Sequence, residues 1–383
     1  MMRVAFLCGA PGSSLLLLAR ELEKTPRVRV VFPWNAAGAI DALARGTAQR
    51  DRAWRGPFAP DQRWIEDALG RWTGSLLDAL WTREAALASG LELLVLGHYE
   101  LARHAPRLHS LAPSAHVIVC ASDGRSAPNG RIPGRGSESE LALAGLAWAR
   151  SWSAALGPAL GLEGLERVHV LRDDELDRDP DAAKARLLAA IGSSAPPAWN
   201  GTRPWARERM HGAPLAGFSC STAARRVLER LGHAPDEPGA FVRNDPELAA
   251  EWALELVADA AGLERAATLL APFERAEPTF ALAFARAELA WRRGERDRAV
   301  DGWCAALELA PARPEPWERL LALSDEARTL PIAARARAAE VPRIRGALAR
   351  WLVARGLDAE AAEIVARVEH EAWTDAPSLP GIR

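Results

Sequence analysis

The stretch that most constrains the fold is the first two dozen residues, where an apolar run, a tight loop and a second apolar run follow one another. Residues 3–8 (RVAFLC) predict a strand, residues 9–14 (GAPGSS) a loop, and residues 15–23 a helix that Ser13 or Ser14 is placed to cap. Such a loop receives the bare backbone N–H groups and the positive end of the helix dipole. The stretch predicts either an anion-binding site or an ordinary strand-to-helix turn. It is not a Walker A loop, because no Gly-Lys-Ser/Thr follows.

Short apolar runs and helical patterns continue to alternate as far as residue 191. Further strands are predicted at residues 28–32, 91–96, 116–120 and 168–171, and helices at 61–89, 101–111, 137–156 and 180–191. The Trp and Leu side chains at helical spacing within 61–89 predict a face buried in the core, rather than one that holds a cofactor. Strands that alternate with helices predict an α/β domain with a parallel sheet, here over residues 1–235.

The carboxyl ends of three predicted strands carry the candidate site. They lead into the loop 9–14, into Gly97–Glu100 and into Ser122–Arg125. In parallel sheets, ligands bind beyond the carboxyl ends of the strands. This convergence favours a nucleotide-type site over a plain turn.

Residues 246–370 are Ala-rich and helical in pattern, without a strand signal, after a linker at about 233–245. Gly294 is followed by Ala299, Trp303, Ala306 and Pro311, a spacing that resembles tetratricopeptide repeats. Three to four imperfect units fit. Such units stack and offer a concave surface, so the resemblance implies an all-α repeat domain that binds a protein or peptide partner. The alternative is a helical cap that only stabilises the first domain.

Composition excludes several classes of protein. The formal net charge is −2 over 383 residues, which gives no basic field for nucleic acid. No apolar run reaches membrane-spanning length, and no signal-peptide pattern opens the chain. The four cysteines are too widely spaced for a metal motif, so no metal is predicted, and they indicate reduced thiols in a cytoplasmic protein.

The α/β segments resemble, in order, the sulfotransferases that use 3′-phosphoadenosine 5′-phosphosulfate (PAPS). That family has a Gly-x-Pro-Arg-Ser-Gly-Thr-Thr loop after its first strand, and residues 9–16 read GAPGSSLL. Residues 111–118 (LAPSAHVI) and 122–126 (SDGRS) stand where the family has a strand that ends in Arg-Asp-Pro-Arg-Asp. The most specific match is residues 172–180 (RDDELDRDP), which lead into a helix and Ile191-Gly192. The resemblance covers residues 3–233 and implies a P-loop NTPase-like fold.

The resemblance also implies a set of cofactor-binding positions. They are Gly9, Pro11, Gly12, Ser13, Ser14, Ser122 and Arg125. Gly12 replaces the basic residue of the family loop, Leu15 and Leu16 replace its two threonines, and Ser122 replaces the first arginine of the second motif. Two lost charge-assisted contacts weaken phosphate binding by orders of magnitude unless other groups substitute. Candidate substitutes are Arg103, Arg107, Arg131, Arg135, Arg207 and Arg209.

Two functions follow as hypotheses. In the first, the protein is a sulfotransferase that moves a sulfuryl group from PAPS to a hydroxyl acceptor, and His98 or Glu100 acts as the catalytic base, with His211 a weaker candidate. In the second, it is a catalytically inactive sulfotransferase-fold protein that works as an interaction scaffold through its helical repeats. The sequence does not identify the acceptor, because acceptor pockets come from variable loops.

Overall fold

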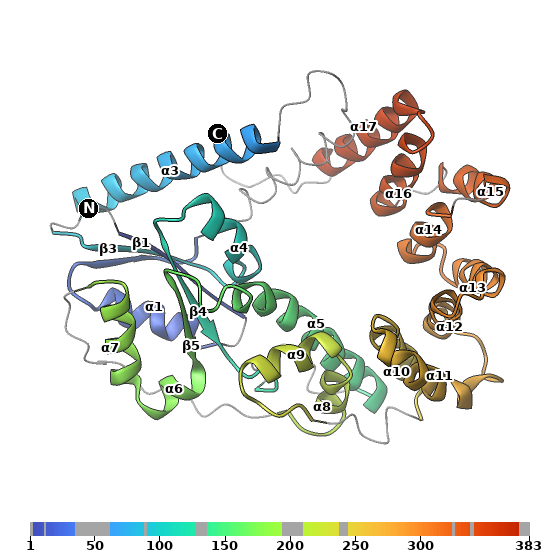
Figure 1. The fold of residues 1–383 in the computed structure, drawn as a ribbon, viewed down its shortest axis with the longest axis horizontal. Helices are drawn as coiled ribbons and strands as arrows, with labels where there is room; N and C mark the ends of the chain where they lie inside the picture. Colours follow the sequence, from blue (N-terminus) through green and yellow to red (C-terminus); the bar gives the residue numbers. More distant parts are fainter. Residues whose placement is uncertain are drawn as a thin grey trace. The chain divides into compact units, whose positions relative to one another are not determined.

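The computed structural model describes residues 3–10, 13–34, 62–87, 90–126, 136–193, 210–236, 244–323, 326–337 and 341–374. The chain divides into two compact units, Met1–Val242 and Arg243–Arg383. The first is an α/β unit and the second is all-helical in its described part, so the two predicted fold classes are confirmed (Figure 1). No helix in the described ranges is both long enough and apolar enough to cross a membrane.

A five-stranded parallel sheet is the centre of the first unit, with strand order β2-β3-β1-β4-β5. The strands are β1 (Val4–Gly9), β2 (Val28–Val31), β3 (Leu93–Gly97), β4 (His116–Ala121) and β5 (Val168–Arg172). β1 lies in the middle, paired with β3 on one side and with β4 on the other. Its whole length is buried, which explains why residues 4–8 read as an uninterrupted apolar run.

The helices of this unit cover both faces of the sheet (Figure 1). They are α1 (Leu15–Glu23), α3 (Gln62–Leu87), α4 (Leu101–Leu111), α5 (Glu138–Leu160), α6 (Asp173–Arg178), α7 (Pro180–Ala190), α8 (Gly212–Ser219) and α9 (Thr222–Arg230). The chain moves toward one edge of the sheet from β1 to β2 and toward the other edge in every later step. Because crossovers between parallel strands are right-handed, α1 lies on one face and α3, α4 and α5 lie on the other.

Two buried clusters confirm this layering. Leu15 and Leu18 of α1 pack with Leu7 of β1 and with α7 residues on one face. On the opposite face, Phe6 of β1 packs with residues of α4 and α5. The predicted buried face of α3 is only partly correct: Leu69, Leu76, Leu80 and Trp81 are partly buried against the core, whereas Trp72 is 44% exposed.

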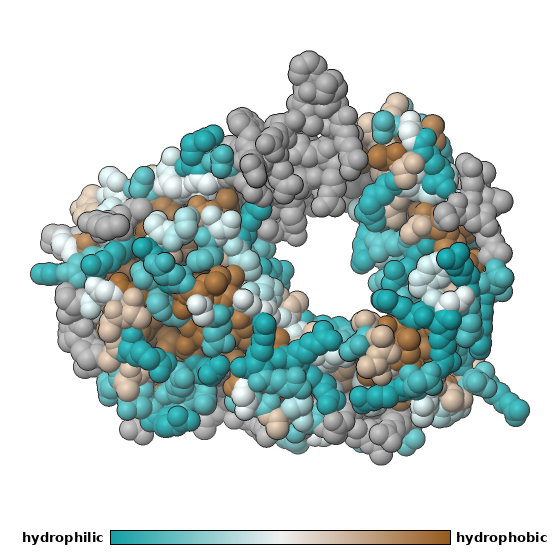
Figure 2. All heavy atoms as spheres, viewed as in Figure 1, coloured by the Kyte–Doolittle hydropathy of each residue, from teal (hydrophilic) through white to brown (hydrophobic). Residues whose placement is uncertain are grey.

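The second unit consists of consecutive helix pairs. The pairs are α10 (Pro246–Val257) with α11 (Leu263–Leu270), α12 (Phe280–Arg292) with α13 (Arg296–Leu309), α14 (Pro314–Leu321) with α15 (Glu326–Arg337), and α16 (Pro342–Val353) with α17 (Asp358–Thr374). Helices of successive pairs also contact each other, as α10 does α12 and α14 does α16. Ala299, Trp303 and Ala306, which the spacing argument singled out, are fully or almost fully buried. Figure 2 shows apolar residues between the helices and polar residues over most of the visible surface.

Candidate functional site

The loop after β1 lies where the fold changes direction. The helix that follows β1 covers one face of the sheet, while the helices that follow its neighbours β3 and β4 cover the other face. A crevice opens at such a switch point, beyond the carboxyl ends of the strands, and it is the usual ligand position in open α/β sheets. Fold and sequence therefore place the candidate site at the same loop.

Gly9 closes β1 in a space that no side chain could enter. A Cβ atom at this position would lie 2.6 Å from the Cys120 carbonyl oxygen of β4 and 2.6 Å from the Ser13 Oγ atom. Real Cβ atoms essentially never approach other atoms so closely, so glycine is required here. The loop thus folds back tightly on β1, and the Ser13 N–H donates to the Ala10 carbonyl at 3.1 Å.

The N-terminus of α1 already holds an anion from the chain itself. The Ser14 N–H donates to the carboxylate Oδ1 of Asp173 at 3.1 Å, and Asp173 is only 5% exposed. Asp173 is the first residue of α6, directly after β5. The helix end that could bind a phosphate is therefore bonded to a buried carboxylate from a distant part of the sequence.

Ser13 and Ser14 do not play the capping role predicted for them. Ser14 is the N-cap residue of α1, but its side chain makes no capping hydrogen bond. The Ser13 hydroxyl is buried and has no hydrogen-bond partner among the described residues. The prediction of a side-chain cap is wrong, because the Ser14 hydroxyl accepts no N–H of the first turn. The polar contact at this helix end comes instead from Asp173, whose carboxylate accepts the Ser14 N–H. Pro11 and Gly12 lie outside the described residues.

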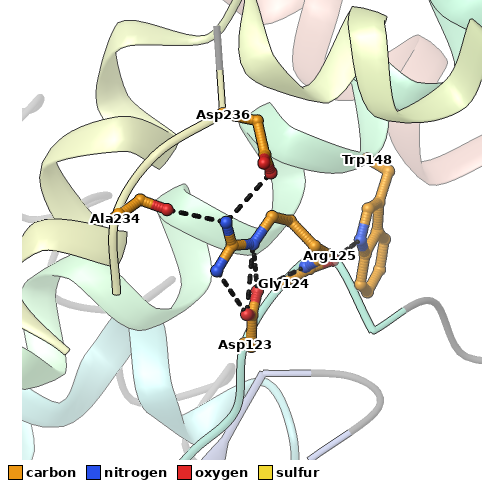
Figure 3. A network of polar contacts seen from close by, with 6 residues as sticks. All are labelled: Asp123, Gly124, Arg125, Trp148, Ala234 and Asp236. Atoms are coloured by element: carbon orange, nitrogen blue, oxygen red, sulfur yellow. Dashed lines mark hydrogen bonds and ion pairs between the residues drawn. The ribbon is translucent and has the colours of Figure 1, made fainter. Parts of the chain in front are cut away.

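Arg125 is held inside a network of carboxylates and carbonyls (Figure 3). Its guanidinium donates to both carboxylate oxygens of Asp123, to Oδ2 of Asp236 at 2.9 Å and to the Ala234 carbonyl at 2.7 Å. Arg125 is only 4% exposed. A guanidinium has five N–H donors on three nitrogens, and here all three nitrogens donate to the chain's own acceptors.

In this network, Asp123 and Arg125 each stabilise the charged form of the other. Burial alone would raise the pKa of the Asp123 carboxyl, but the hydrogen bonds and the charge of Arg125 outweigh it and lower that pKa. The hydrogen bond with Asp123, opposed in part by burial, raises the pKa of Arg125. Asp123 and Arg125 are therefore both charged at neutral pH. Two carboxylates around one guanidinium leave a net negative charge where a phosphate would need a positive one.

The backbone of the same corner is fixed by neighbouring elements. The Trp148 indole N–H of α5 donates to the Gly124 carbonyl at 2.7 Å, and the Met210 N–H donates to the Arg125 carbonyl at 2.7 Å. A Cβ on Gly124 would lie 2.5 Å from the Trp152 ring. Ser122, at the start of this corner, is buried. Hydrogen bonds and close packing thus connect this corner after β4 to α5 and to the segment 234–236.

His98 and Glu100 follow β3, on the other side of β1 from this corner. The Glu100 N–H donates to His98 Nδ1 at 3.1 Å, so the neutral ring carries its proton on Nε2. The ring would have to give up that bond to take a second proton on Nδ1. Glu100 precedes α4, is exposed and makes no side-chain cap. Their catalytic role stays a prediction.

The other cationic candidates contribute little to a common site in the described part of the chain. Arg103 is exposed and Arg107 half-buried, both on α4, and His211 precedes α8. Arg131, Arg135, Arg207 and Arg209 lie outside the described residues. Sequence reasoning missed Asp173 and Asp236. Asp173 lies in the segment 172–180, where the sequence shows acidic residues directly after a predicted strand. That position was the available signal.

Comparison with models of known protein families finds no match for this chain, and no curated protein matches it.

Proposed function

We propose that this protein is a catalytically inactive relative of the sulfotransferases that works as an interaction scaffold through its C-terminal helices. The order of segments along residues 3–233 supports the relationship. So does the position of the Gly9–Ser14 loop at the switch point beside the central strand. The helix pairs of the second unit, with small buried residues such as Ala299 and Ala306, support the tetratricopeptide-like reading.

The proposal rests on the fact that the guanidinium of Arg125 is already bound by the chain's own carboxylates. In the resemblance, the first arginine of the second motif grips the 3′-phosphate of the nucleotide, and Ser122 replaces it here. Arg125, the arginine of that motif that keeps its place, is held by Asp123 and Asp236 in a buried network. At the β1–α1 loop, where the phosphosulfate would sit, Asp173 occupies the N-terminus of α1. The Ser13 hydroxyl, which lies against Gly9, would donate a hydrogen bond to an anion. The three carboxylates do not fit one, because each would be left beside a like charge in a poorly solvated position.

Titration with adenosine 3′,5′-bisphosphate, the nucleotide left after sulfuryl transfer, tests the proposal. We expect no heat of binding at millimolar nucleotide. The variant Asp123→Asn/Asp236→Asn/Asp173→Asn keeps the side-chain shapes and removes three negative charges. It should bind the nucleotide at least about tenfold more tightly than the unaltered chain, because charge-assisted contacts to phosphate replace like-charge repulsion. Glu315→Gln in the helical unit is the matched charge-removal control and should change nothing.

A second candidate function, sulfuryl transfer from PAPS to a hydroxyl acceptor, is favoured by one observation. The buried Ser13 hydroxyl lacks a partner within the described part of the chain and lies against Gly9, where a bound oxyanion could accept from it. This candidate predicts micromolar affinity of the unaltered chain for the bisphosphate, lost in both Ser13→Ala and Arg125→Ala. That result would overturn the scaffold proposal, and an acceptor screen would follow.

A further inference from the structure

Four basic side chains lie together at the end of the sheet where its strands begin. The β1–α1 loop lies at the opposite end, where the strands finish. Arg3 immediately precedes β1, His116 begins β4, Arg167 immediately precedes β5, and His169 lies within β5. The register pairs Ala5 with His116 and Ile118 with His169, so the three strands begin side by side. Both histidines belong to the face that α1 and α7 cover, because they alternate with residues packed against the other face.

The two histidines form one unit. His116 Nδ1 lies 2.9 Å from His169 Nε2, and the two rings stack with their centroids 5.2 Å apart. Each ring is half-buried. One proton is shared between the facing nitrogens, and one outward nitrogen is then an acceptor. The neutral pair holds two protons, and when it takes up one more, both outward nitrogens are N–H donors and the pair gains a positive charge.

The charged groups around the pair are almost all basic. Burial, then the charges of His169, Arg167 and Arg3, lower the pKa of His116 to about 4. Burial also lowers the pKa of His169. The Arg3 guanidinium donates to the Gly192 carbonyl after α7, and Arg167 donates to the Ser114 carbonyl.

Backbone carbonyls therefore hold the two arginines, and they leave the cationic charge unbalanced. In the described residues, the carboxylate paired with this group is Glu166, which lies 3.5 Å from Arg167 and is 89% exposed. This differs from Arg125, which two carboxylates neutralise. Within the described ranges no buried acid faces this cluster of bases, and a bound anion would supply the missing negative charge.

We propose that the cluster of Arg3, His116, Arg167 and His169 binds a tetrahedral dianion, sulfate or a phosphate group, when the histidine pair takes up a proton. The two guanidinium groups and the two outward imidazole N–H groups are donors that suit such an oxyanion. Binding to the protonated form draws a proton onto the pair, so affinity rises as pH falls. This anion site does not depend on whether the β1–α1 loop binds a nucleotide, because it lies at the opposite end of the strands.

Calorimetric titration with sodium sulfate at about pH 5.5 and about pH 8 tests this site. Sulfate is a dianion at both values, so a pH dependence belongs to the protein. We expect at least about tenfold tighter binding at the lower pH, because above the pKa of the pair the protonated fraction, which binds the dianion, increases as the pH falls. His116→Gln and His169→Gln should remove most of this difference, and His104→Gln on α4 should keep it. Equal affinity at both pH values, or no binding at the lower one, would overturn the proposal.

Two further measurements do not depend on the variants being folded. Sulfate added to the unaltered chain should shift the imidazole NMR signals of two histidines that share a single titration, and no such shift would contradict the site. Parallel titrations with inorganic phosphate and glycerol 3-phosphate identify the source of the anion. Tighter binding of the ester assigns the site to a phosphorylated ligand, and equal binding assigns it to the free anion.

Acid stability should respond to the same ligand. The unfolded chain binds protons on His116 below a pKa of about 6.5, whereas the folded chain binds them only near the folded-state pKa of about 4. The unfolded state therefore holds more protons between these values, and stability falls as pH decreases through this window. Sulfate should raise the unfolding temperature more at about pH 5 than at about pH 8. Chloride at equal ionic strength is the control, and an equal effect of the two salts would contradict a specific site.

Discussion

Replacing Gly217 with alanine is expected to destabilise the α/β unit by at least about 3 kcal/mol, because its methyl group has no space. A Cβ at this position of α8 would lie 1.7 Å from the Ala142 carbonyl oxygen of α5. Gly145 of α5 meets α8 in the same way, with a Cβ position 2.0 Å from the Pro214 carbonyl oxygen. The two helices cross backbone against backbone, and any side chain must push them apart and open the core around Trp152 and Phe218.

Urea unfolding of the full chain measures this effect, and Gly157→Ala on α5 is the matched control. The nearest atom to a Cβ at Gly157 is a Val227 methyl carbon at 3.6 Å, which is ordinary contact. Since alanine is the better helix former by about 1 kcal/mol, Gly157→Ala should be neutral or stabilising. A loss below about 1 kcal/mol in Gly217→Ala would mean that α5 and α8 are not in close contact.

Replacing Glu288 with alanine should destabilise the helical unit by about 2–4 kcal/mol. Glu288 of α12 is 5% exposed and accepts from the Trp303 indole of α13 at 3.0 Å. It also accepts two hydrogen bonds from Arg319 of α14, at 2.7 and 2.8 Å. One carboxylate thus ties three successive helices, and its removal leaves a buried indole N–H without a partner.

Thermal unfolding followed by circular dichroism measures the loss, with Glu264→Ala as the control. The Glu264 side chain is 88% exposed and pairs with Arg293 at 2.9 Å, so its removal should cost less than about 1 kcal/mol. Glu288→Gln keeps the volume and a hydrogen-bond acceptor for Trp303, so it should fall between the two. Equal effects of Glu288→Ala and Glu264→Ala would show that the buried network does not stabilise the unit.

Much of the fold followed from local patterns. The helix 101–111 has the predicted bounds, and all five strands begin and end within two residues of prediction. The helix predicted to begin at residue 137 does so with a capping box, in which Ser137 and Glu140 bond to each other's backbone. These features depend on neighbours a few residues away, which a sequence shows directly. Trp72 was predicted to be buried and is not, because the periodicity of a helix does not reveal how much of its apolar face the rest of the fold covers.

In the candidate site, too, the local features could be predicted from the sequence and the contacts between distant residues could not. The sequence by itself determined the strand, the small-residue loop and the helix N-terminus, because backbone conformation and hydrophobic periodicity are local properties. Only the tertiary structure decided which charges meet there. Asp173 is 159 residues from Ser14, and Asp236 is 111 residues from Arg125. Such partners are brought together by strand order and helix packing, and a charged side chain in a sequence does not indicate which distant group will neutralise it.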